Sequence, residues 1–548
     1  MTNKEIARKF NLLGKVMELH GENPFKIRSY SSAYNTIRRY PDELVEMTRE
    51  DLMSIKGIGK NIADKIEELR ETGSMITLKR FLEQTPKGVV ELLGIKGLGA
   101  KKILAVWKDL GIESPGELLY ACEENRLIDL KGFGEKTQIN LRDKLIYYLD
   151  AQGKYLYGHI ESEAIELLGL IRSQFADHRF EFINDVRRQM PIVESIEILG
   201  SADESEIKDF VDGLDGSENE ENVRSYKGTR ILYHAVELDD FDPVLFEGSA
   251  SPEFLVGWKT KFGKVGSGAE QYLFESNGLA YLPPESRESE MAIQSALRQD
   301  FELINDSHIK GVIHCHTTYS DGANSVRQMW EHAEKLGFEY ILITDHSQSA
   351  FYANGLKEDR VDQQHAEIDQ INQELGTKRI FKGIESDILY DGSLDYPEDV
   401  LSRFDVIIAS VHSNLKMDEV KATDRVLQAV SNPFTRILGH PTGRLLLSRE
   451  GYPLDHMAVI DACADHGVSI ELNANPYRLD LDWTWIPYAV EKGVMISINP
   501  DAHNINGISD IKYGVSAARK ALLQPSSCLN TLSLEDFSRW VSQKRACQ

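Results

Sequence analysis

The sequence predicts three folded parts: an all-α N-terminal region, an α+β middle region, and a C-terminal array of parallel strands and helices. Three observations lead to this prediction. A glycine motif recurs within residues 1–150, helical and strand-like runs mix over 151–290, and seven short apolar runs follow residue 309. A chain of 548 residues also exceeds one core, because domains usually hold about 100–200 residues. We therefore expect domains at 1–150, 151–290 and 309–548, with a linker at 291–308.

The N-terminal region reads as short amphipathic helices separated by glycine turns. Each copy of the motif has a lysine before its first glycine and another lysine within four residues after its second. Repetition of one structural unit is informative in itself, although a plain helical hairpin ended by glycine gives a similar pattern. The recurring positions are Gly57, Gly59 and Lys60, then Gly97, Gly99 and Lys101, then Gly132, Gly134 and Lys136.

Charge is unevenly distributed along the chain, whose net charge is −25. Residues 1–150 carry 25 Lys and Arg against 23 Asp and Glu, a net +2, which leaves −27 for the remainder. The first quarter is therefore the part most compatible with a polyanion. No apolar run is long enough to span a membrane, and no signal peptide is recognisable. Five scattered cysteines without CxxC spacing fit a reducing cytoplasm.

The seven apolar runs after residue 309 alternate with helical stretches, which indicates a parallel sheet, either open or closed. Seven repeats favour a closed barrel. The predicted strands are Gly311–His314, Tyr340–Thr344, Ile380–Ile384, Val406–Val411, Arg436–Gly439, Val468–Leu472 and Met495–Ile498.

Histidines and carboxylates follow these runs, and in a barrel such strand ends meet at one face. One buried histidine is often structural, but nine polar side chains packed together would be costly without a cation. Mixed imidazole and carboxylate ligands suit zinc, manganese or iron, and nine exceed the needs of one ion. The candidate ligands and catalytic residues are His314, His316, Asp321, His346, Glu385, His412, His440, Asp501 and His503.

The segments 314–322, 344–347 and 500–503 resemble the polymerase-and-histidinol-phosphatase (PHP) domain. This resemblance implies a distorted (β/α)7 TIM-like barrel with two or three divalent ions, Mn²⁺, Zn²⁺ or Fe²⁺, that hydrolyses phosphate esters. The implied ligand sets are His314, His316, Glu385 and Asp501 for one ion, Glu385, His412 and His440 for a second, and Asp321, His346 and His503 for a third. Arg444 and Arg449, shortly after His440, could clamp phosphate or be plain surface arginines.

The repeated glycine element resembles the helix-hairpin-helix, in which backbone N–H groups at a helix start meet DNA phosphates. The segments 23–30 and 57–65 are similar to the 8-kDa domain of family X DNA polymerases, where Lys65 takes the place of a lyase Schiff-base lysine; a surface helical lysine is the alternative. The whole chain resembles bacterial family X polymerases with a C-terminal PHP domain. This implies a nucleotidyltransferase-like middle, a role in DNA repair in the bacterial cytoplasm, and 3′–5′ exonuclease or abasic-site cleavage on single-stranded, gapped or abasic DNA.

The middle region departs from that family at its polymerase site. The expected Gly-Ser-x-Arg-Arg turn reads Gly200-Ser201-Ala202-Asp203-Glu204, with acids in place of both arginines. No Asp-x-Asp follows, because Asp209 and Asp212 have the wrong spacing, and His234 lies near the third carboxylate position. Two-metal phosphoryl transfer needs those carboxylates. We therefore predict that polymerase activity is lost or negligible.

Three alternatives remain open. The chain could be an active family X polymerase with displaced ligands, which primer extension would reveal. It could be a small-molecule phosphatase of the histidinol-phosphatase type, although the three N-terminal motifs count against this. It could be a non-enzymatic DNA-binding adaptor, although the full ligand set counts against that.

Overall fold

The computed structural model describes residues 1–123, 127, 130, 133–150, 153–220, 223–447 and 450–543. The chain divides into two compact units, Met1–Gln152 and Gly153–Gln548, which we describe separately. Two predicted site residues, Gly132 and Arg449, lie outside the described residues. Among the described helices, none is both long and apolar enough to cross a membrane.

The first unit is helical throughout its described part. Its core is one cluster of apolar side chains, with Phe10, Leu13, Leu52 and Leu92 fully buried. Polar N-caps start several helices; Thr2 forms a capping box with Glu5 at the first. The helices are α1 Asn3–Leu19, α2 Pro24–Arg39, α3 Arg49–Ser54, α4 Lys60–Thr72, α5 Ile76–Glu83, α6 Lys87–Leu92, α7 Ala100–Leu110, α8 Pro115–Glu123 and α9 Glu135–Asp150.

The described residues of the three glycine motifs share one backbone hydrogen bond. In each, the backbone N–H of the apolar residue between the glycines donates to the carbonyl three residues earlier, at 3.0 Å for Ile58, 3.1 Å for Leu98 and 2.9 Å for Phe133. Gly57 and Gly97 have φ of 98° and 89°, a conformation that favours glycine. The second glycine then precedes a helix, α4, α7 or α9. The repeat predicted from sequence is thus a repeated turn-to-helix unit.

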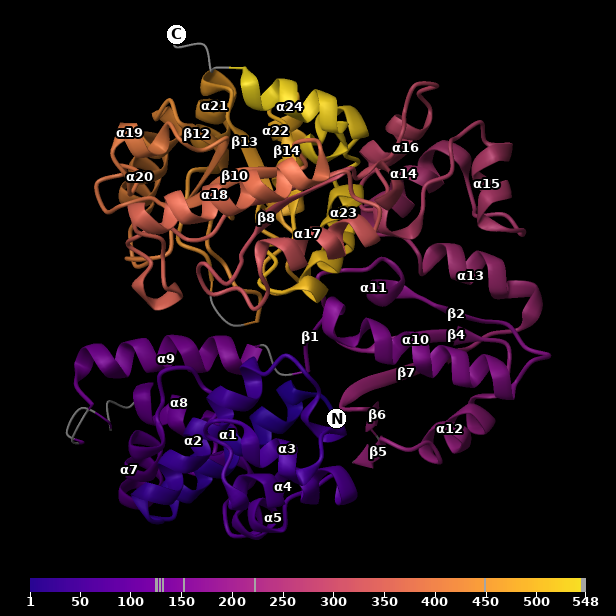
Figure 1. The fold of residues 1–548 in the computed structure, drawn as a ribbon. Helices are drawn as coiled ribbons and strands as arrows, with labels where there is room; N and C mark the ends of the chain where they lie inside the picture. Colours follow the sequence, from indigo (N-terminus) through magenta and orange to yellow (C-terminus); the bar gives the residue numbers. More distant parts are fainter. Residues whose placement is uncertain are drawn as a thin grey trace. The chain divides into compact units, whose positions relative to one another are not determined.

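The middle of the chain combines a sheet with helices (Figure 1). The five-stranded sheet has the order β2-β4-β7-β6-β5, and β4 pairs parallel with β7. These strands are β2 Phe180–Phe182, β4 Ile196–Gly200, β5 Ser217–Glu220, β6 Val223–Tyr226 and β7 Thr229–Ala235. A two-stranded pair, β1 Tyr155–Leu156 and β3 Ile192–Val193, lies outside it. The polar segment Ser217–Glu220 is a strand, because β5 pairs antiparallel with β6 there.

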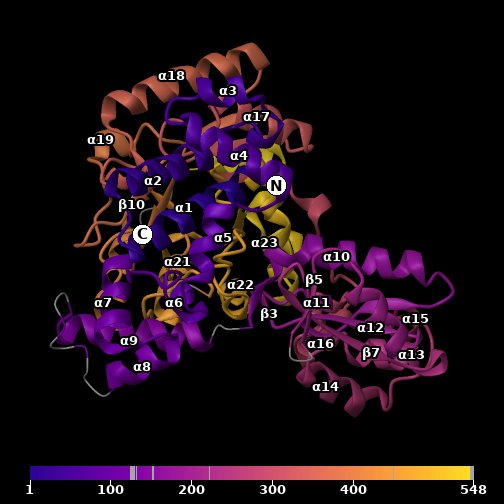
Figure 2. The same ribbon diagram turned by 90° about the horizontal axis from the view of Figure 1, so that it is seen from below.

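Helices accompany this sheet, and Figure 2 shows several of them around β7. They are α10 Tyr157–Gln174, α11 Asn184–Arg187, α12 Glu204–Asp212, α13 Phe241–Glu247, α14 Pro252–Phe262, α15 Glu270–Ser276 and α16 Glu290–Ala296. Much of α16 lies in the segment expected as a linker. It is packed, since Ala292, Ile293 and Ala296 are buried with Trp258 of α14.

The C-terminal part is a parallel barrel. Its seven strands follow the sheet order of the chain: β8 Gly311–Cys315, β9 Tyr340–Ile343, β10 Ile380–Asp387, β11 Val406–Ser410, β12 Thr435–Leu438, β13 Ser469–Asn473 and β14 Ile496–Asn499. A parallel bridge between Cys315 and Ala502 links the first strand to the segment after the last. Two backbone hydrogen bonds support it, from His316 N to Ala502 O at 2.9 Å and from Ala502 N to His314 O at 3.2 Å.

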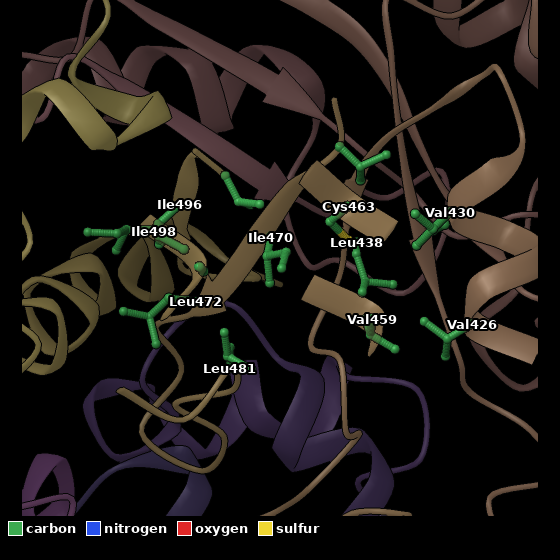
Figure 3. Packing of buried hydrophobic residues seen from close by; sticks show 14 of the residues in the cluster. Val426, Val430, Leu438, Val459, Cys463, Ile470, Leu472, Leu481, Ile496 and Ile498 are labelled. Carbon is green, nitrogen blue, oxygen red and sulfur yellow. The ribbon is translucent and has the colours of Figure 1, made fainter. Parts of the chain in front are cut away.

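Helices surround these strands (Figure 1). They are α17 Val326–Lys335, α18 Glu358–Leu375, α19 Glu398–Leu401, α20 Glu419–Ser431, α21 His456–His466, α22 Ile486–Glu491, α23 Ile511–Lys520 and α24 Leu534–Ser542. Apart from the partly exposed Lys382 and Arg436, the strand residues are buried, as expected of a parallel sheet covered on both faces. Figure 3 shows Val426 and Val459, from α20 and α21, packed beside Leu438 of β12. The predicted fold class, from helical N-terminal region to seven-stranded barrel, is confirmed.

Within the second unit, α23 of the barrel is joined to the middle region. Tyr513 donates from its hydroxyl to Glu161 at 2.9 Å, and Arg519 forms an ion pair with Glu285 at 2.7 Å. Lys520 is fully buried; its Nζ donates to Arg188 O and lies 3.4 Å from Glu288. The middle region and the barrel therefore form one packed body.

Candidate metal centre

The nine predicted side chains converge at the C-terminal end of the barrel. They come from six of the seven strands, because parallel strands deliver the residues at their ends to one face. They are His314 on β8, His316 and Asp321 after it, His346 after β9, Glu385 on β10, His412 after β11, His440 after β12, and Asp501 and His503 after β14.

Three groups of these residues bring their ligand atoms within 4.8 Å of one another. The groups are His314, His316 and Asp501; His346, Glu385 and His412; and His316, Asp321, His346 and His503. They differ from the sets implied by the PHP resemblance in four ways. His316 also joins the group of Asp321, and His346 also joins that of Glu385. Glu385 is absent from the group of His314, and His440 belongs to none of the three groups.

Glu385 lies at the centre of the cluster. Its Oε1 is 2.9 Å from His440 Nε2, 3.1 Å from His412 Nε2 and 3.3 Å from His314 Nε2. Its Oε2 is 2.9 Å from His346 Nδ1. His316 Nε2 is 3.6 Å from the same Oε2, so five imidazoles from four strand ends surround this carboxylate, which is suited to be shared between two cations.

The buried atoms of the cluster fit a bound cation. Among the described residues, His314 Nε2, both ring nitrogens of His316, Glu385 Oε2 and Asp501 Oδ1 have no hydrogen-bond partner. Buried polar atoms without partners are costly, and a divalent ion satisfies such lone pairs. The depth of the donors is graded, since the His314 and His316 side chains are fully buried while those of Asp321 and His503 are 34% and 38% exposed. The last two thus mark the open side of the cluster.

The electrostatics of the cluster point the same way. Burial lowers the pKa of His316 to about 4, with a further contribution from its imidazole neighbours. Burial alone would lower the pKa of His412, but the carboxylates of Glu385 and Asp387 raise this pKa to about 10. Burial also opposes ionisation of Glu385, but the surrounding imidazoles hold its pKa well below the usual range. The carboxylate therefore stays charged and attracts positive charge to this place, as metal ligands must.

A carboxylate that the sequence reasoning missed supports the cluster from behind. Glu471 on β13 is fully buried and accepts from His314 Nδ1 at 2.6 Å, from His440 N at 3.1 Å, and from Asn499 Nδ2 at 2.7 Å. Such a partner fixes the ring orientation and tautomer of a ligating histidine. The signal was a single acid between the apolar residues Ile470 and Leu472 in the strand Ser469–Asn473.

Asp387 plays the same part for a second histidine. It accepts from His412 Nδ1 at 2.5 Å and, through its other oxygen, from Ser349 Oγ at 2.8 Å. It was missed because β10 continues to Asp387, three residues beyond the predicted strand end at Ile384.

The backbone at two ligand positions is unusual. His314 and Asp501 have φ of 68° and 51°, in the left-handed region that non-glycine residues rarely adopt. The register between β8 and β9 also shifts between Val312 and Cys315. The simple alternation of an extended strand therefore does not hold at His314. Such outliers are typical of functional sites, where the surrounding structure holds them.

A phosphate-clamping role for Arg444 stays a prediction, and in the structure its side chain is engaged within the protein. Its guanidinium donates to Asp482 Oδ2 at 2.6 Å, to Arg478 O at 2.9 Å and to Leu479 O, so its donors already hold the loop after β13. Arg478, in that loop, is the arginine that faces the cluster. Its Nε lies 3.7 Å from Asp501 Oδ2, and within the described part of the chain its guanidinium makes no hydrogen bond.

The remaining predicted positions lie in the first unit. Gly59, Gly99, Gly134, Lys60, Lys101 and Lys136 are exposed at helix starts. Lys65 is not a plain surface lysine, because its side chain is 13% exposed and its Nζ donates to Thr77 Oγ1 at 2.8 Å. It lines an open pocket of about 400 Å³ with Tyr30 and Arg80. A lyase role for Lys65 stays a prediction.

In the middle region, the residues at the positions expected for a polymerase site make contacts within the protein. Asp203 caps α12 and accepts from Ser205 N at 2.8 Å, and Glu204 follows in the first turn. Asp212 is paired with Arg224 at 2.8 Å. His234 Nε2 lies 2.9 Å from Glu197, so the position expected for a third carboxylate holds an imidazole bonded to a neighbouring acid.

Comparison with family models divides the chain in the same order as the fold. Residues 1–75 match the helix-hairpin-helix domain, residues 89–145 the SAM-like helix-hairpin-helix tandem, and residues 313–474 the PHP domain. Two curated relatives match less than half of this chain. A probable phosphatase of Caldanaerobacter subterraneus is 25% identical over 45% of this chain and 94% of its own length. A probable phosphatase of Thermoanaerobacter sp. is 27% identical over 40% of this chain and 89% of its own length.

A third relative matches from end to end. The DNA polymerase/3′-5′ exonuclease PolX of Bacillus subtilis is 34% identical, and the similarity covers 99% of this chain and 100% of the relative. Helix-hairpin-helix elements, an α+β middle and a PHP barrel with a histidine and carboxylate cluster thus occur together in a chain that this relative matches over its full length. The chain belongs to the bacterial PolX family.

Proposed function

We propose that this protein is a divalent-metal-dependent DNA phosphodiesterase that acts in repair as a 3′–5′ exonuclease, an abasic-site endonuclease or both. The observation that carries the proposal is the set of buried, unbonded donor atoms of His314, His316, Glu385 and Asp501 at the barrel mouth. Two or three ions, Mn²⁺, Zn²⁺ or Fe²⁺, suit such mixed nitrogen and oxygen ligands. When bound, such ions supply Lewis-acid chemistry toward phosphate oxygens and water.

Other residues of the site orient the ligand histidines and can bind the phosphate. Glu471 and Asp387 hold the rings of His314 and His412 by accepting from their Nδ1 atoms. Arg478 offers a cation with free donors beside Asp501, where it can hold a phosphate oxygen. Because it is mostly buried, its charge is weakly screened, and the phosphate it binds is held in a fixed orientation.

The helix-hairpin-helix elements support DNA as the substrate. Their exposed glycines and lysines lie at the starts of α4, α7 and α9, where backbone N–H groups can meet phosphate oxygens. A small phosphate ester does not require such a delivery surface. The probable phosphatases that resemble the PHP part match less than half of this chain.

Polymerase activity is, in our proposal, lost. A triphosphate at the start of α12 would meet Asp203 and Glu204, and like charges repel. Asp212 is engaged by Arg224 and so is not free to hold a metal ion. Primer extension with Mn²⁺ tests this. Template-dependent synthesis that is abolished by Asp209→Asn and Asp212→Asn would overturn it.

The main experiment incubates end-labelled single-stranded, gapped and abasic DNA with Mn²⁺. We compare the wild type with Asp321→Asn and His503→Gln, because both residues are partly exposed and their substitution spares the core. His332→Gln, on α17, is the control. We expect cleavage by the wild type and the control and its loss in the two variants. Equal cleavage by all four would refute the site, and turnover of p-nitrophenyl phosphate without DNA cleavage would favour a phosphatase.

A further inference from the structure

Large hydrophobic side chains lie exposed around the mouth of the barrel. Within the described residues of 309–543, five such side chains are exposed: Leu336, Phe351, Tyr390, Val420 and Met457. Four of them follow β9, β10, β11 and β12 in turn, in the loop or at the start of the next helix, so they belong to the end of the barrel that carries the metal cluster. Only Leu336 follows a helix, α17, and so lies at the opposite end.

Phe351 and Tyr390 are the two aromatic members. Phe351 is 84% exposed and Tyr390 61% exposed, so neither contributes much to the packing of the barrel. Burying an aromatic side chain is strongly favourable, and single exposed ones need a reason only when they gather at a site. Here both occur on loops that begin within six residues of a candidate ligand, His346 or Glu385.

Hydrogen bonds tie these two loops to each other and to the cluster. Ser349, two residues before Phe351, donates from Oγ to Asp387 Oδ2 at 2.8 Å and from its backbone N–H to Asp395 Oδ2 at 2.7 Å. Tyr390 lies between those two aspartates in the sequence. Asp387 in turn accepts from His412 Nδ1. The loops that carry the two aromatic residues are therefore linked through Asp387 to the candidate ligand His412.

A basic side chain accompanies one of the aromatic rings. Lys421, on α20, places its Nζ 4.4 Å from the centroid of the Tyr390 ring. A ring face beside an ammonium group is the combination that binds single-stranded nucleic acid, in which the base stacks on the ring and the backbone phosphate pairs with the cation. A duplex hides its base faces, so it cannot use such a surface.

We propose that Phe351 and Tyr390 form a stacking platform for unpaired nucleobases next to the scissile phosphodiester. The platform would select a frayed or single-stranded DNA end over a paired one at the barrel mouth. This inference rests on the proposed function and names the substrate feature that the same site reads. The two residues are positioning residues, since they lie outside the metal cluster.

The test separates stacking from the chemistry at the cluster. Phe351→Ala, Tyr390→Ala and the double variant are compared with the wild type. Leu336→Ala serves as the control, because it removes another exposed apolar side chain, at the far end of the barrel. Each protein cleaves two single-stranded oligonucleotides. One carries bases throughout, and the other carries base-free tetrahydrofuran residues at the two positions next to the cleaved bond.

We expect each aromatic substitution to lower kcat/KM for the first oligonucleotide about tenfold or more, mainly through KM, because a base stacked on an aromatic ring typically contributes at that level. On the base-free oligonucleotide the wild type should itself be slow, and the variants should match it. Leu336→Ala should behave as the wild type on both.

Two outcomes would overturn the inference. Wild-type cleavage that is equally fast on both oligonucleotides, or variants that lose activity equally on both, would show that no base is stacked. Sedimentation adds a further check, because an oligomer that Phe351→Ala dissociates without change in cleavage would make this surface a protein interface. If the wild type cleaves neither oligonucleotide with Mn²⁺, the proposed function itself fails, which is a distinguishable result.

Discussion

Replacing Glu471 by glutamine tests whether a buried carboxylate holds the metal cluster in place. Glu471 accepts four hydrogen bonds, from His314 Nδ1, His440 N, Asn473 Nδ2 and Asn499 Nδ2. Glutamine keeps the size of the side chain but removes its charge and turns an N–H₂ group toward at least one of these donors. The His314 ring then loses the partner that fixes its orientation.

The expected loss follows from the position of Glu471 behind two ligands. Removing such a partner usually weakens metal affinity or activity about 10–100-fold. At about 1.4 kcal/mol per factor of ten, this corresponds to roughly 1.4–2.7 kcal/mol. The unsatisfied donor adds about 1–3 kcal/mol of lost folding stability. We therefore expect a lower melting temperature as well as weaker binding.

The assay titrates Mn²⁺ into metal-free protein by calorimetry and measures DNA cleavage at saturating Mn²⁺. Glu197→Gln is the matched control, because Glu197 also accepts from a histidine, His234 at 2.9 Å, but in the middle region. The control should bind Mn²⁺ as the wild type does. Folded Glu471→Gln protein with unchanged Mn²⁺ affinity, or an equal loss in the control, would refute the reasoning.

Three further predictions address the cluster, the DNA surface and the domain joint. Chelation of divalent ions should abolish cleavage and lower the melting temperature, because His316 and Asp501 then keep buried atoms without partners; an unchanged melting temperature would count against a metal site. An added Cβ at Gly59 or Gly99 meets no atom within 4 Å, so each alanine should lower the free energy of unfolding by at most about 1 kcal/mol as an N-cap change. The double variant should bind DNA more weakly in a binding titration, and unchanged affinity would contradict the hairpin interface. Burial lowers the pKa of Lys520 to about 8, whereas the unfolded side chain titrates near 10.4. Between these pH values the unfolded state binds more protons, so the free energy of unfolding should rise with pH across that window. In denaturant melts Lys520→Met should lose this rise, and a variant that retains it would refute the assignment.

Much of the fold follows from sequence pattern alone. The apolar runs after residue 309 appear as strands within a few residues of their predicted limits, because strands buried on both faces must be apolar throughout. The repeated glycine turns were visible because a positive φ at Gly57 and Gly97 restricts the residue type. Composition does not indicate a strand at β5, whose polar residues pair with β6 because the neighbouring strand decides the pairing there.

The sequence by itself also determined which side chains meet at the barrel mouth, since the ends of parallel strands share one face whatever the packing between them. Only the tertiary structure decided their partners. Glu471 contacts His314 across 157 positions, and Arg444 is occupied by Asp482 while Arg478 faces the cluster. A ligand is recognisable from its place on a strand, but a hydrogen bond depends on distances of a few tenths of an ångström. Those distances are set by the closure of the barrel and the packing of its loops, which no local pattern records.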